Sequence, residues 1–201
     1  VLSEEGSKTV PASRAYWVVD PLDGTTNFAA GIPFWAISVA RFVDGRPSEV
    51  FLDMPLLGQR LVALRGRGVT RDGEPLTAET RLAATSACVS LCSRSIRVLQ
   101  RNPDQRFPGK IRLLGVASRN LVSVAMGQTI AALEASPKIW DLAAAWLVLD
   151  ELGCPIRWLE ADPAHLTPGD DLQQASFPML AAGSWSVLAQ FLPWGEALLR
   201  R

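Results

Sequence analysis

The chain has 201 residues, of which 48% are hydrophobic and 20% are charged, so it is long enough to bury the core of one domain. Its 20 basic residues balance its 20 acidic ones, which excludes a general charge attraction to nucleic acid or anionic membrane. No apolar run approaches the roughly 20 residues that span a bilayer, and the first residues lack the pattern of a signal peptide. Cys88, Cys92 and Cys154 form no pattern of a disulfide framework or a zinc site, so a reduced, cytoplasmic setting is expected.

The first half of the chain is rich in short β-forming runs separated by turn signals. Strands are expected at 16–20, 36–42, 49–53 and 60–64, and "VDGRPS" predicts a hairpin between the second and third. Residues 81–91 predict a further strand that leads into a helix around 90–101. The segment 101–110, with two prolines and a glycine, is the best candidate for a junction. We therefore expect one domain, 1–201, made of an α+β half (1–105) and an α/β half (106–201).

The second half alternates strand and helix patterns, which indicates an α/β arrangement. Strands are expected at 111–115, 129–135 and 177–183, and helices at 117–127, 140–153 and 184–201. In the middle helix Asp141 is placed as the N-cap and Gly153 as the stop. Pro193 predicts an interruption of the last helix.

One short segment, "DPLDGTTNF" (20–28), follows an apolar strand with two carboxylates three positions apart. Pro21 and the Asp23-Gly24 turn can bend the chain so that Asp20, Asp23 and the Leu22 carbonyl face one point. Such hard oxygen donors suit Mg²⁺. The alternative is an ordinary Asp-Gly turn in which Asp23 bonds its own backbone.

Further acids favour the metal site over the turn. Glu4 and Glu5 end the run "VLSEE", and Asp141 opens a helix, where the dipole favours an anion. His165 is the only histidine and lies in a turn-rich loop, so chemistry is expected to rest on carboxylates. Acids at strand ends and a helix start are what a dinuclear metal site on an α/β scaffold needs to hold a phosphoryl group.

The combination of "DPLDGTTNF", "SEEG", "GIPFWAISVA", "RLLGVASRNLVSVAMG" and "WD.AA" resembles the inositol monophosphatase family of magnesium-dependent phosphatases, over nearly the whole chain. The resemblance implies an α/β (α+β layered) fold with alternating helix and sheet layers of the sugar-phosphatase type. The family normally begins with a pair of helices before the "EE" strand. These are missing here, so the first helical layer is expected to be absent.

The resemblance also implies roles for individual residues. Glu4 and Thr25 would orient and help deprotonate the attacking water, in a direct in-line displacement without a phospho-enzyme. The remaining roles follow the family's motifs: Mg²⁺ ligation by Glu4, Asp20, the Leu22 carbonyl, Asp23 and Asp141; phosphate binding by Gly24, Thr25 and Thr26; and substrate binding by Asp23, Gly115, Val116, Ala117, Glu134 and Asp141.

The implied function is hydrolysis of an inositol or related polyol or sugar monophosphate by a cytoplasmic homodimer. Fructose bisphosphate and histidinol phosphate stay open as substrates. The competing hypothesis is a weakly active or inactive family member that acts as a protein-interaction module, since some bacterial relatives bind the transcription machinery. Neither nucleic acid nor membrane is expected as a partner.

Overall fold

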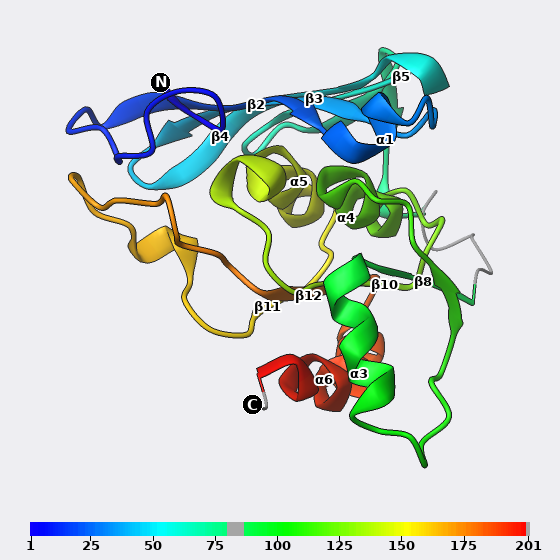
Figure 1. Ribbon diagram of the computed structural model, residues 1–201. Helices are drawn as coiled ribbons and strands as arrows, with labels where there is room; N and C mark the ends of the chain where they lie inside the picture. The colour runs from blue at the N-terminus through cyan, green and yellow to red at the C-terminus, as the bar shows by residue number, and fades with distance from the viewer. Residues whose placement is uncertain (80–86, 200–201) are drawn as a thin grey trace.

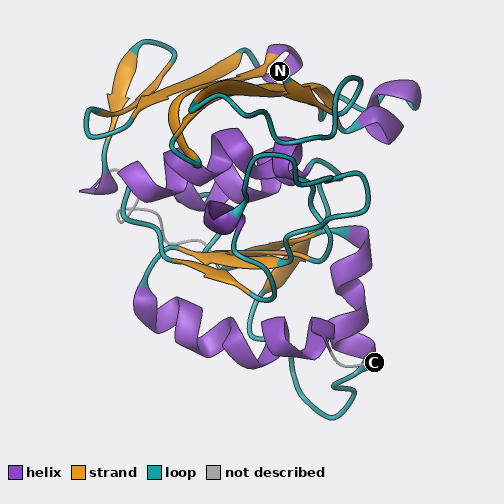
Figure 2. Cartoon of the chain, turned by 90° about the vertical axis from the view of Figure 1, so that its left-hand side faces the viewer, coloured by secondary structure: helices purple, strands orange, loops and turns teal. Residues whose placement is uncertain are grey.

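The computed structural model describes residues 1–79 and 87–199. Two β-sheets enclose a layer of helices, and further helices cover the outer face of the second sheet (Figure 1, Figure 2). This arrangement confirms the layered α/β class expected from the sequence. Within the described residues, no helix has the length and apolar character needed to cross a bilayer.

The first sheet takes up the N-terminal part of the chain, and its strands lie side by side in sequence order. Only the first pair of strands is parallel, and the other pairs are antiparallel. Alternating residues such as Val18, Ala40 and Phe42 are buried, as expected for a sheet that packs on one face. The strands are β1 (Leu2–Ser3), β2 (Ala15–Asp23), β3 (Ala36–Val43), β4 (Arg46–Met54), β5 (Gln59–Leu64), β6 (Gly68–Arg71) and β7 (Glu74–Leu76).

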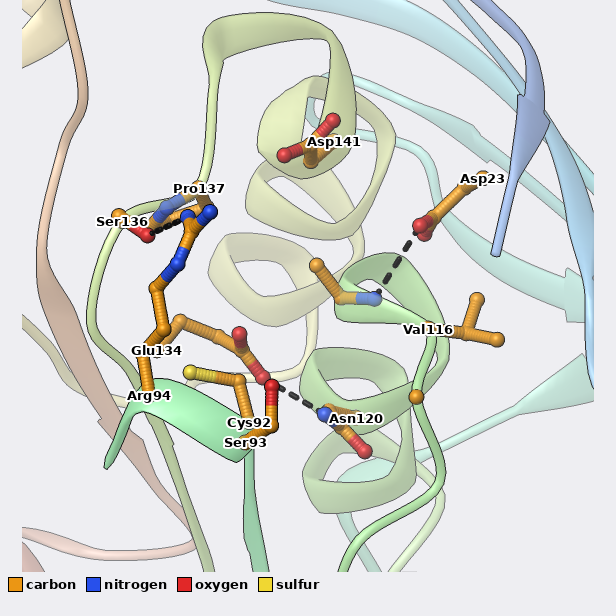
Figure 3. Close-up of a pocket in the computed structure, with 12 residues that line it drawn as sticks. Asp23, Cys92, Ser93, Arg94, Val116, Asn120, Glu134, Ser136, Pro137 and Asp141 are labelled. Atoms are coloured by element: carbon orange, nitrogen blue, oxygen red, sulfur yellow. Dashed lines mark hydrogen bonds between the residues drawn. The ribbon is translucent and has the colours of Figure 1, made fainter. Parts of the chain in front are cut away.

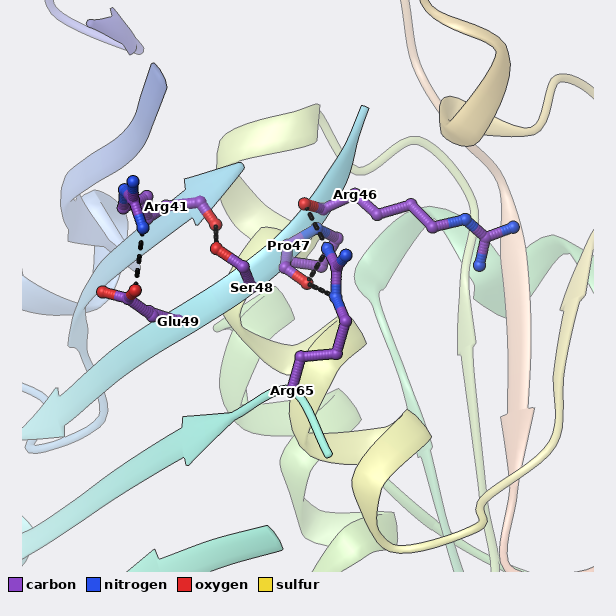
Figure 4. Close-up of polar contacts among 6 residues, drawn as sticks. All are labelled: Arg41, Arg46, Pro47, Ser48, Glu49 and Arg65. Carbon is purple, nitrogen blue, oxygen red and sulfur yellow. Dashed lines mark hydrogen bonds and ion pairs between the residues drawn. The ribbon is translucent and has the colours of Figure 1, made fainter. Parts of the chain in front are cut away.

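The hairpin between β3 and β4 confirms the prediction from "VDGRPS". Asp44 and Gly45 both have positive φ (53° and 76°), which matches the right-handed twist of the flanking strands. Beyond the turn, the Ser48 hydroxyl donates to the Arg41 carbonyl (3.0 Å), and Arg41 pairs with Glu49 (2.8 Å) (Figure 4). Arg65, just after β5, donates to backbone carbonyls of the same hairpin, so its guanidinium has a structural task.

The helical layer consists of α4 (Ala117–Ala125) and α5 (Ile139–Glu151), which lie between the two sheets (Figure 1). Because α5 is enclosed by both sheets, it is apolar nearly all round, from Leu142 to Leu149. Its C-cap is Leu152, and Gly153 follows with φ 64°, so the predicted stop is confirmed. The first turn of this buried helix carries Asp141, and the packing of the helix holds Asp141 near the end of β2.

The second sheet runs in the order β11-β12-β10-β8-β9. Strands β10, β8 and β9 are parallel, and β12 is antiparallel to both of its neighbours. Helices α3 and α6 lie on the side away from α4 and α5 (Figure 1, Figure 2). The elements are β8 (Cys88–Leu91), α3 (Arg97–Gln100), β9 (Lys110–Arg112), β10 (Ala131–Glu134), β11 (Ile156–Trp158), β12 (Met179–Ala182) and α6 (Trp185–Leu199).

Some sequence predictions need adjustment. The prediction that Pro193 interrupts the last helix is wrong, because α6 continues through this residue. Proline removes one helical hydrogen bond, but Phe191 and Trp194 are buried against Phe107 and hold the helix in place. The strand expected at 111–115 is β9 and ends at Arg112. Of the prediction for 81–91, residues up to 86 lie outside the described residues.

The division of the domain at 105/106 stays a prediction. The change from the first sheet to the second falls earlier in the chain, between β7 and β8. On the face of the first sheet opposite α5, Trp17 is 44% exposed and Leu64 is 39% exposed. In the described residues no helix packs across this face.

Candidate metal and phosphate site

Strand β2 does not end at Asp20 but runs through Pro21 to Asp23, with a register shift against β3 between these two acids. The expectation that Asp20 is the last strand residue is therefore wrong. Strand β1 pairs with β2 only at Val18 and Val19, so Pro21 lies where that edge of β2 is unpaired and its missing N–H costs nothing. The irregularity separates the two carboxylates along the strand while keeping both buried.

Gly24 is required directly behind Asp23. Its φ is 94°, and a Cβ placed there would lie 2.7 Å from Val116 Cγ2 and 3.1 Å from the Phe34 carbonyl. Gly24 follows the last residue of β2 and is the N-cap of the short helix α1 (Thr25–Ala29). Thr25 and Thr26 are exposed on this helix, and the Thr25 hydroxyl donates to the Leu22 carbonyl (3.2 Å). The same close packing places Gly24 against the loop that precedes α4.

Asn27 is a structural member of the site that had no predicted role. Its side chain is buried and donates to the carbonyls of Phe34 (2.9 Å) and Leu114 (2.7 Å). Gly115, with φ 76°, passes so close that a Cβ would lie 2.8 Å from Asn27 Nδ2. Asn27 thus ties the acidic motif to the loop 114–117, of which Gly115, Val116 and Ala117 line the cavity.

Asp20 is the most poorly satisfied acid of the site. Its side chain is buried, Oδ1 accepts the Leu22 N–H (2.9 Å), and Oδ2 is buried with no hydrogen-bond partner. Burial, followed by the charge of Asp23, raises the pKa of Asp20 to about 8. A buried carboxylate oxygen without a partner is costly and indicates a ligand or counter-ion.

Asp23, by contrast, is well supported. Its Oδ2 accepts the hydroxyl (2.6 Å) and the N–H (2.7 Å) of Ser118, and its Oδ1 accepts the Ala117 N–H (3.3 Å). Burial raises the pKa of Asp23 to about 6, and the Ser118 bonds oppose that rise. The start of α4 therefore holds this carboxylate in place.

Asp141 is the third residue of α5, not its N-cap as the sequence suggested. The N-cap is Lys138, whose N–H donates to Asp141 Oδ2 (2.8 Å). Helix formation begins earlier because Ile139 and Trp140 are buried and fit the first turn. Burial, followed by the charge of Asp23, raises the pKa of Asp141 to about 8.

Glu4 lies in the loop after β1, within electrostatic range of Asp20, Asp23 and Asp141. Its side chain is only partly buried. The Lys8 ammonium donates to the carbonyls of Ser3 and Glu4 and lies 5.2 Å from the centre of the Trp140 ring. Lys8 therefore fastens the Glu4 loop beside the start of α5.

A cavity of about 240 Å³ opens beside these acids (Figure 3). Predicted and unpredicted residues line it together: Asp23, Gly115, Val116, Ala117, Glu134 and Asp141 from the predicted set, and Cys92, Ser93, Arg94, Asn120, Ser136 and Pro137 in addition. Glu134 is buried, and its Oε1 accepts the Asn120 amide (2.7 Å). Burial raises the pKa of Glu134 well above its usual range. The remaining predicted residues do not line this cavity: Glu4, Asp20, Leu22, Gly24, Thr25 and Thr26.

The donor set fits a hard divalent cation. The buried Asp20 Oδ2 lacks a partner, and Asp23, Asp141 and the Leu22 carbonyl add oxygen ligands of the type that Mg²⁺ and Ca²⁺ prefer. In residues 1–79 and 87–199 no three acidic, histidine or cysteine side chains form a ready-made cluster. The acids are instead bound by backbone N–H groups, through one oxygen in Asp20 and Asp141 and through both oxygens in Asp23.

The layered fold and the buried acids beside an open cavity define a class of layered α/β protein with carboxylates gathered near the end of β2. Residues 1–184 match the model of the inositol monophosphatase family. The chain belongs to that family.

Individual relatives agree with this assignment. The Nus factor SuhB of Pasteurella multocida is 30% identical over 84% of this chain and 66% of its own length. The histidinol-phosphatase of Mycobacterium tuberculosis is 32% identical over 76% of this chain and 62% of its own length. This chain thus spans less than two thirds of either relative. A solved IMPase/NADP phosphatase complexed with NADP and Ca²⁺ superposes with a TM-score of 0.74 at 25% identity, covering 94% of this chain and 73% of the other.

Proposed function

We propose that the chain is a Mg²⁺-dependent phosphomonoesterase that hydrolyses a polyol or sugar phosphate, with inositol monophosphate as the reference substrate. The observation that carries the proposal is the buried, unpartnered Oδ2 of Asp20 beside Asp23 and Asp141. Three such acids destabilise each other unless a cation neutralises them. The similar IMPase/NADP phosphatase, which is complexed with NADP and Ca²⁺, supports a divalent cation as the ligand.

Glu4, Asp20, the Leu22 carbonyl, Asp23 and Asp141 would hold the cation. When bound, a divalent cation supplies charge that offsets the phosphate and lowers the pKa of a coordinated water. The Thr25 hydroxyl, which donates to the Leu22 carbonyl (3.2 Å), would help to orient such a water, and the partly buried Glu4 would accept the proton of that water.

Phosphate and leaving group would be bound by different segments of the chain. The start of α1, with Gly24, Thr25 and Thr26, presents backbone N–H groups and hydroxyls for the phosphate. Gly115, Val116, Ala117 and Glu134 line the cavity on the side of the leaving group. Val116 is apolar, so Glu134 and Asn120 supply polar contacts to the alcohol.

Asp20→Asn tests the proposal, with Asp53→Asn as its matched control. Asp53 lies on β4, where it contacts Arg60 (3.3 Å) outside the cavity. We expect the wild type and Asp53→Asn to release phosphate from inositol 1-phosphate in the presence of Mg²⁺, and Asp20→Asn to be inactive although folded. Equal rates in the wild type and Asp20→Asn would contradict the proposal.

The second candidate is a protein-interaction module, which the name Nus factor SuhB of a relative favours. Histidinol phosphate remains a candidate substrate because another relative is named for it. The family resemblance also supports a homodimer in the cytoplasm. Light scattering on the purified chain tests whether it is a dimer. If phosphate release depends on Asp20 and a pull-down recovers no protein partner, the phosphatase is favoured over the protein-interaction module.

A further inference from the structure

Arg94 is a cationic residue on the cavity wall that the proposed mechanism does not use. It belongs to the short 3-10 helix η2 (Ser93–Ile96), which directly follows β8. Among the described residues that line the cavity, it is the single lysine, arginine or histidine. Its side chain runs along one wall, and Asp23 and Val116 lie on the opposite side (Figure 3).

The guanidinium of Arg94 has no acidic partner in the part of the chain that the structure describes. The ion pairs there are Arg14–Asp44, Arg41–Glu49 and Arg60–Asp53. Arg94 donates through Nη1 to the neutral Ser136 hydroxyl. Most of its five N–H donors are therefore available to a ligand, and a guanidinium fork matches phosphate and carboxylate oxygens.

The neighbours of Arg94 leave it free for such a ligand. Ser93, Cys92 and Ser136 are uncharged and line the same part of the cavity. Glu134, the nearest cavity acid from β10, has Oε1 on the Asn120 amide rather than on Arg94. The cavity thus has an acidic end at Asp23 and Asp141 and a basic group on another wall (Figure 3).

We propose that Arg94 binds a second anionic group, phosphate or carboxylate, on the alcohol part of the substrate while the first phosphate is held at the acidic end. This inference rests on the proposed phosphatase function. It shifts the preferred substrate from a neutral polyol monophosphate to a small phosphate ester with two anionic groups. A cationic alcohol such as histidinol would instead meet an unpaired guanidinium and be disfavoured.

Steady-state kinetics with four phosphate esters tests the proposal in the presence of Mg²⁺. The esters are fructose 1,6-bisphosphate (second phosphate), 3-phosphoglycerate (carboxylate), inositol 1-phosphate (neutral) and histidinol phosphate (cationic). The variants are Arg94→Gln and Arg94→Lys. Arg106→Gln is the matched control, because Arg106 is exposed and does not line the cavity.

We expect Arg94→Gln to lower kcat/KM about tenfold or more for the doubly anionic esters, as hydrogen bonds to charged groups predict. The neutral ester should change less than about threefold, Arg94→Lys should be intermediate, and Arg106→Gln should match the wild type. The preferred doubly anionic ester identifies the second group as phosphate or carboxylate. Equal losses for all four esters, or a wild-type preference for the neutral or cationic ester, would overturn the assignment.

Calorimetric titration of the wild type and Arg94→Gln with the same esters, without divalent cation, separates binding from turnover. If no ester is hydrolysed but fructose 1,6-bisphosphate binds the wild type about tenfold tighter than Arg94→Gln, the phosphatase proposal fails and the anion site stands. The anion site is overturned if the wild type and Arg94→Gln bind fructose 1,6-bisphosphate with equal affinity. It is also overturned if the wild type neither turns over nor binds any of the esters.

Discussion

The two ends of the cavity differ in how the chain builds them. At the acidic end, Asp23 belongs to the short segment Asp20 to Asn27, whose backbone is fixed by the register shift in β2 and by Gly24, and Asp141 belongs to the first turn of α5. The leaving-group end is assembled from separate segments: η2 with Arg94, the loop at Gly115 to Ala117, and the end of β10 with Glu134. Under the proposed function, part of the cation site is therefore encoded locally, whereas the group proposed to select the alcohol depends on how distant loops meet.

The largest effect is expected at the acidic end from Asp141→Asn. The change removes a proposed cation ligand worth several kcal/mol, so kcat/KM should fall by about 10³-fold. Asp150→Asn, on the exposed end of the same helix, should stay near the wild type. Phosphate release from the preferred ester measures both, and a small loss in Asp141→Asn would remove this residue from the site.

Ser118→Ala should have the next largest effect, because it withdraws the 2.6 Å hydroxyl donor from Asp23. Loss of such a supporting partner typically costs about 10–100-fold in metal affinity or activity. Ser123→Ala is the matched control on α4, since Ser123 is equally buried but bonds Asn120 and Thr129 away from Asp23. Urea unfolding measures the stability of both variants and so separates a loss of stability from a loss of activity. Equal activity losses in both variants would show that the activity follows only the stability of α4.

The acidic end should also make the cation-free protein sensitive to pH. Folding raises the pKa values of Asp20 and Asp141 from 3.8 to about 8, so the folded state keeps protons that the unfolded chain has released. Stability should therefore be highest below pH 3.8 as far as these groups are concerned, and it should fall as pH rises toward 8. The slope is about 1.4 kcal/mol per pH unit for one titrating group.

Urea unfolding of the wild type and Asp20→Asn without divalent cation, between pH 5 and 8, checks this slope. Asp20→Asn should show a shallower decline, because it removes one of the titrating groups. A wild-type stability that stays constant or rises across this range would contradict the electrostatic description of the acidic end.

The smallest effect is expected at the leaving-group end from Glu134→Gln. Burial holds the pKa of Glu134 well above its usual range, so a neutral amide mimics the side chain, and its oxygen can keep the Asn120 bond. We expect KM to change less than about threefold and kcat to stay unchanged, whereas Glu134→Ala should lose more. A loss in Glu134→Gln as large as that in Asp141→Asn would mean that the two ends are not distinct in function.

Much of the fold could be predicted because it depends on local patterns. The β3–β4 hairpin follows from Asp44-Gly45, and the end of α5 from Gly153. The course of β2 could not be predicted, because Pro21 is compatible with a strand only where the neighbouring strand β1 stops short. The start of α5 shifted for a similar reason, since burial of Ile139 decides it and not the capping preference of Asp141.

The candidate site shows the same division. Asp20, Asp23, Glu4 and Asp141 were predicted from residue type, position and the family resemblance, and in the structure they lie within electrostatic range of one another. Arg94, Asn120 and Ser118 were missed because their roles arise only when β8 and α4 meet the cavity. Asn27 could have been found, since a buried amide inside a turn motif must satisfy its donors, here on the carbonyls of Phe34 and Leu114.

The most direct measurement of the central claim is calorimetric titration of Mg²⁺ into the wild type, Asp20→Asn and Asp53→Asn at pH 8. The claim is that the unpartnered Oδ2 of Asp20 marks a divalent-cation site at the end of β2. It predicts saturable binding to the wild type and Asp53→Asn, with a higher thermal unfolding temperature, and loss of both in Asp20→Asn. Identical binding curves for the wild type and Asp20→Asn would contradict it.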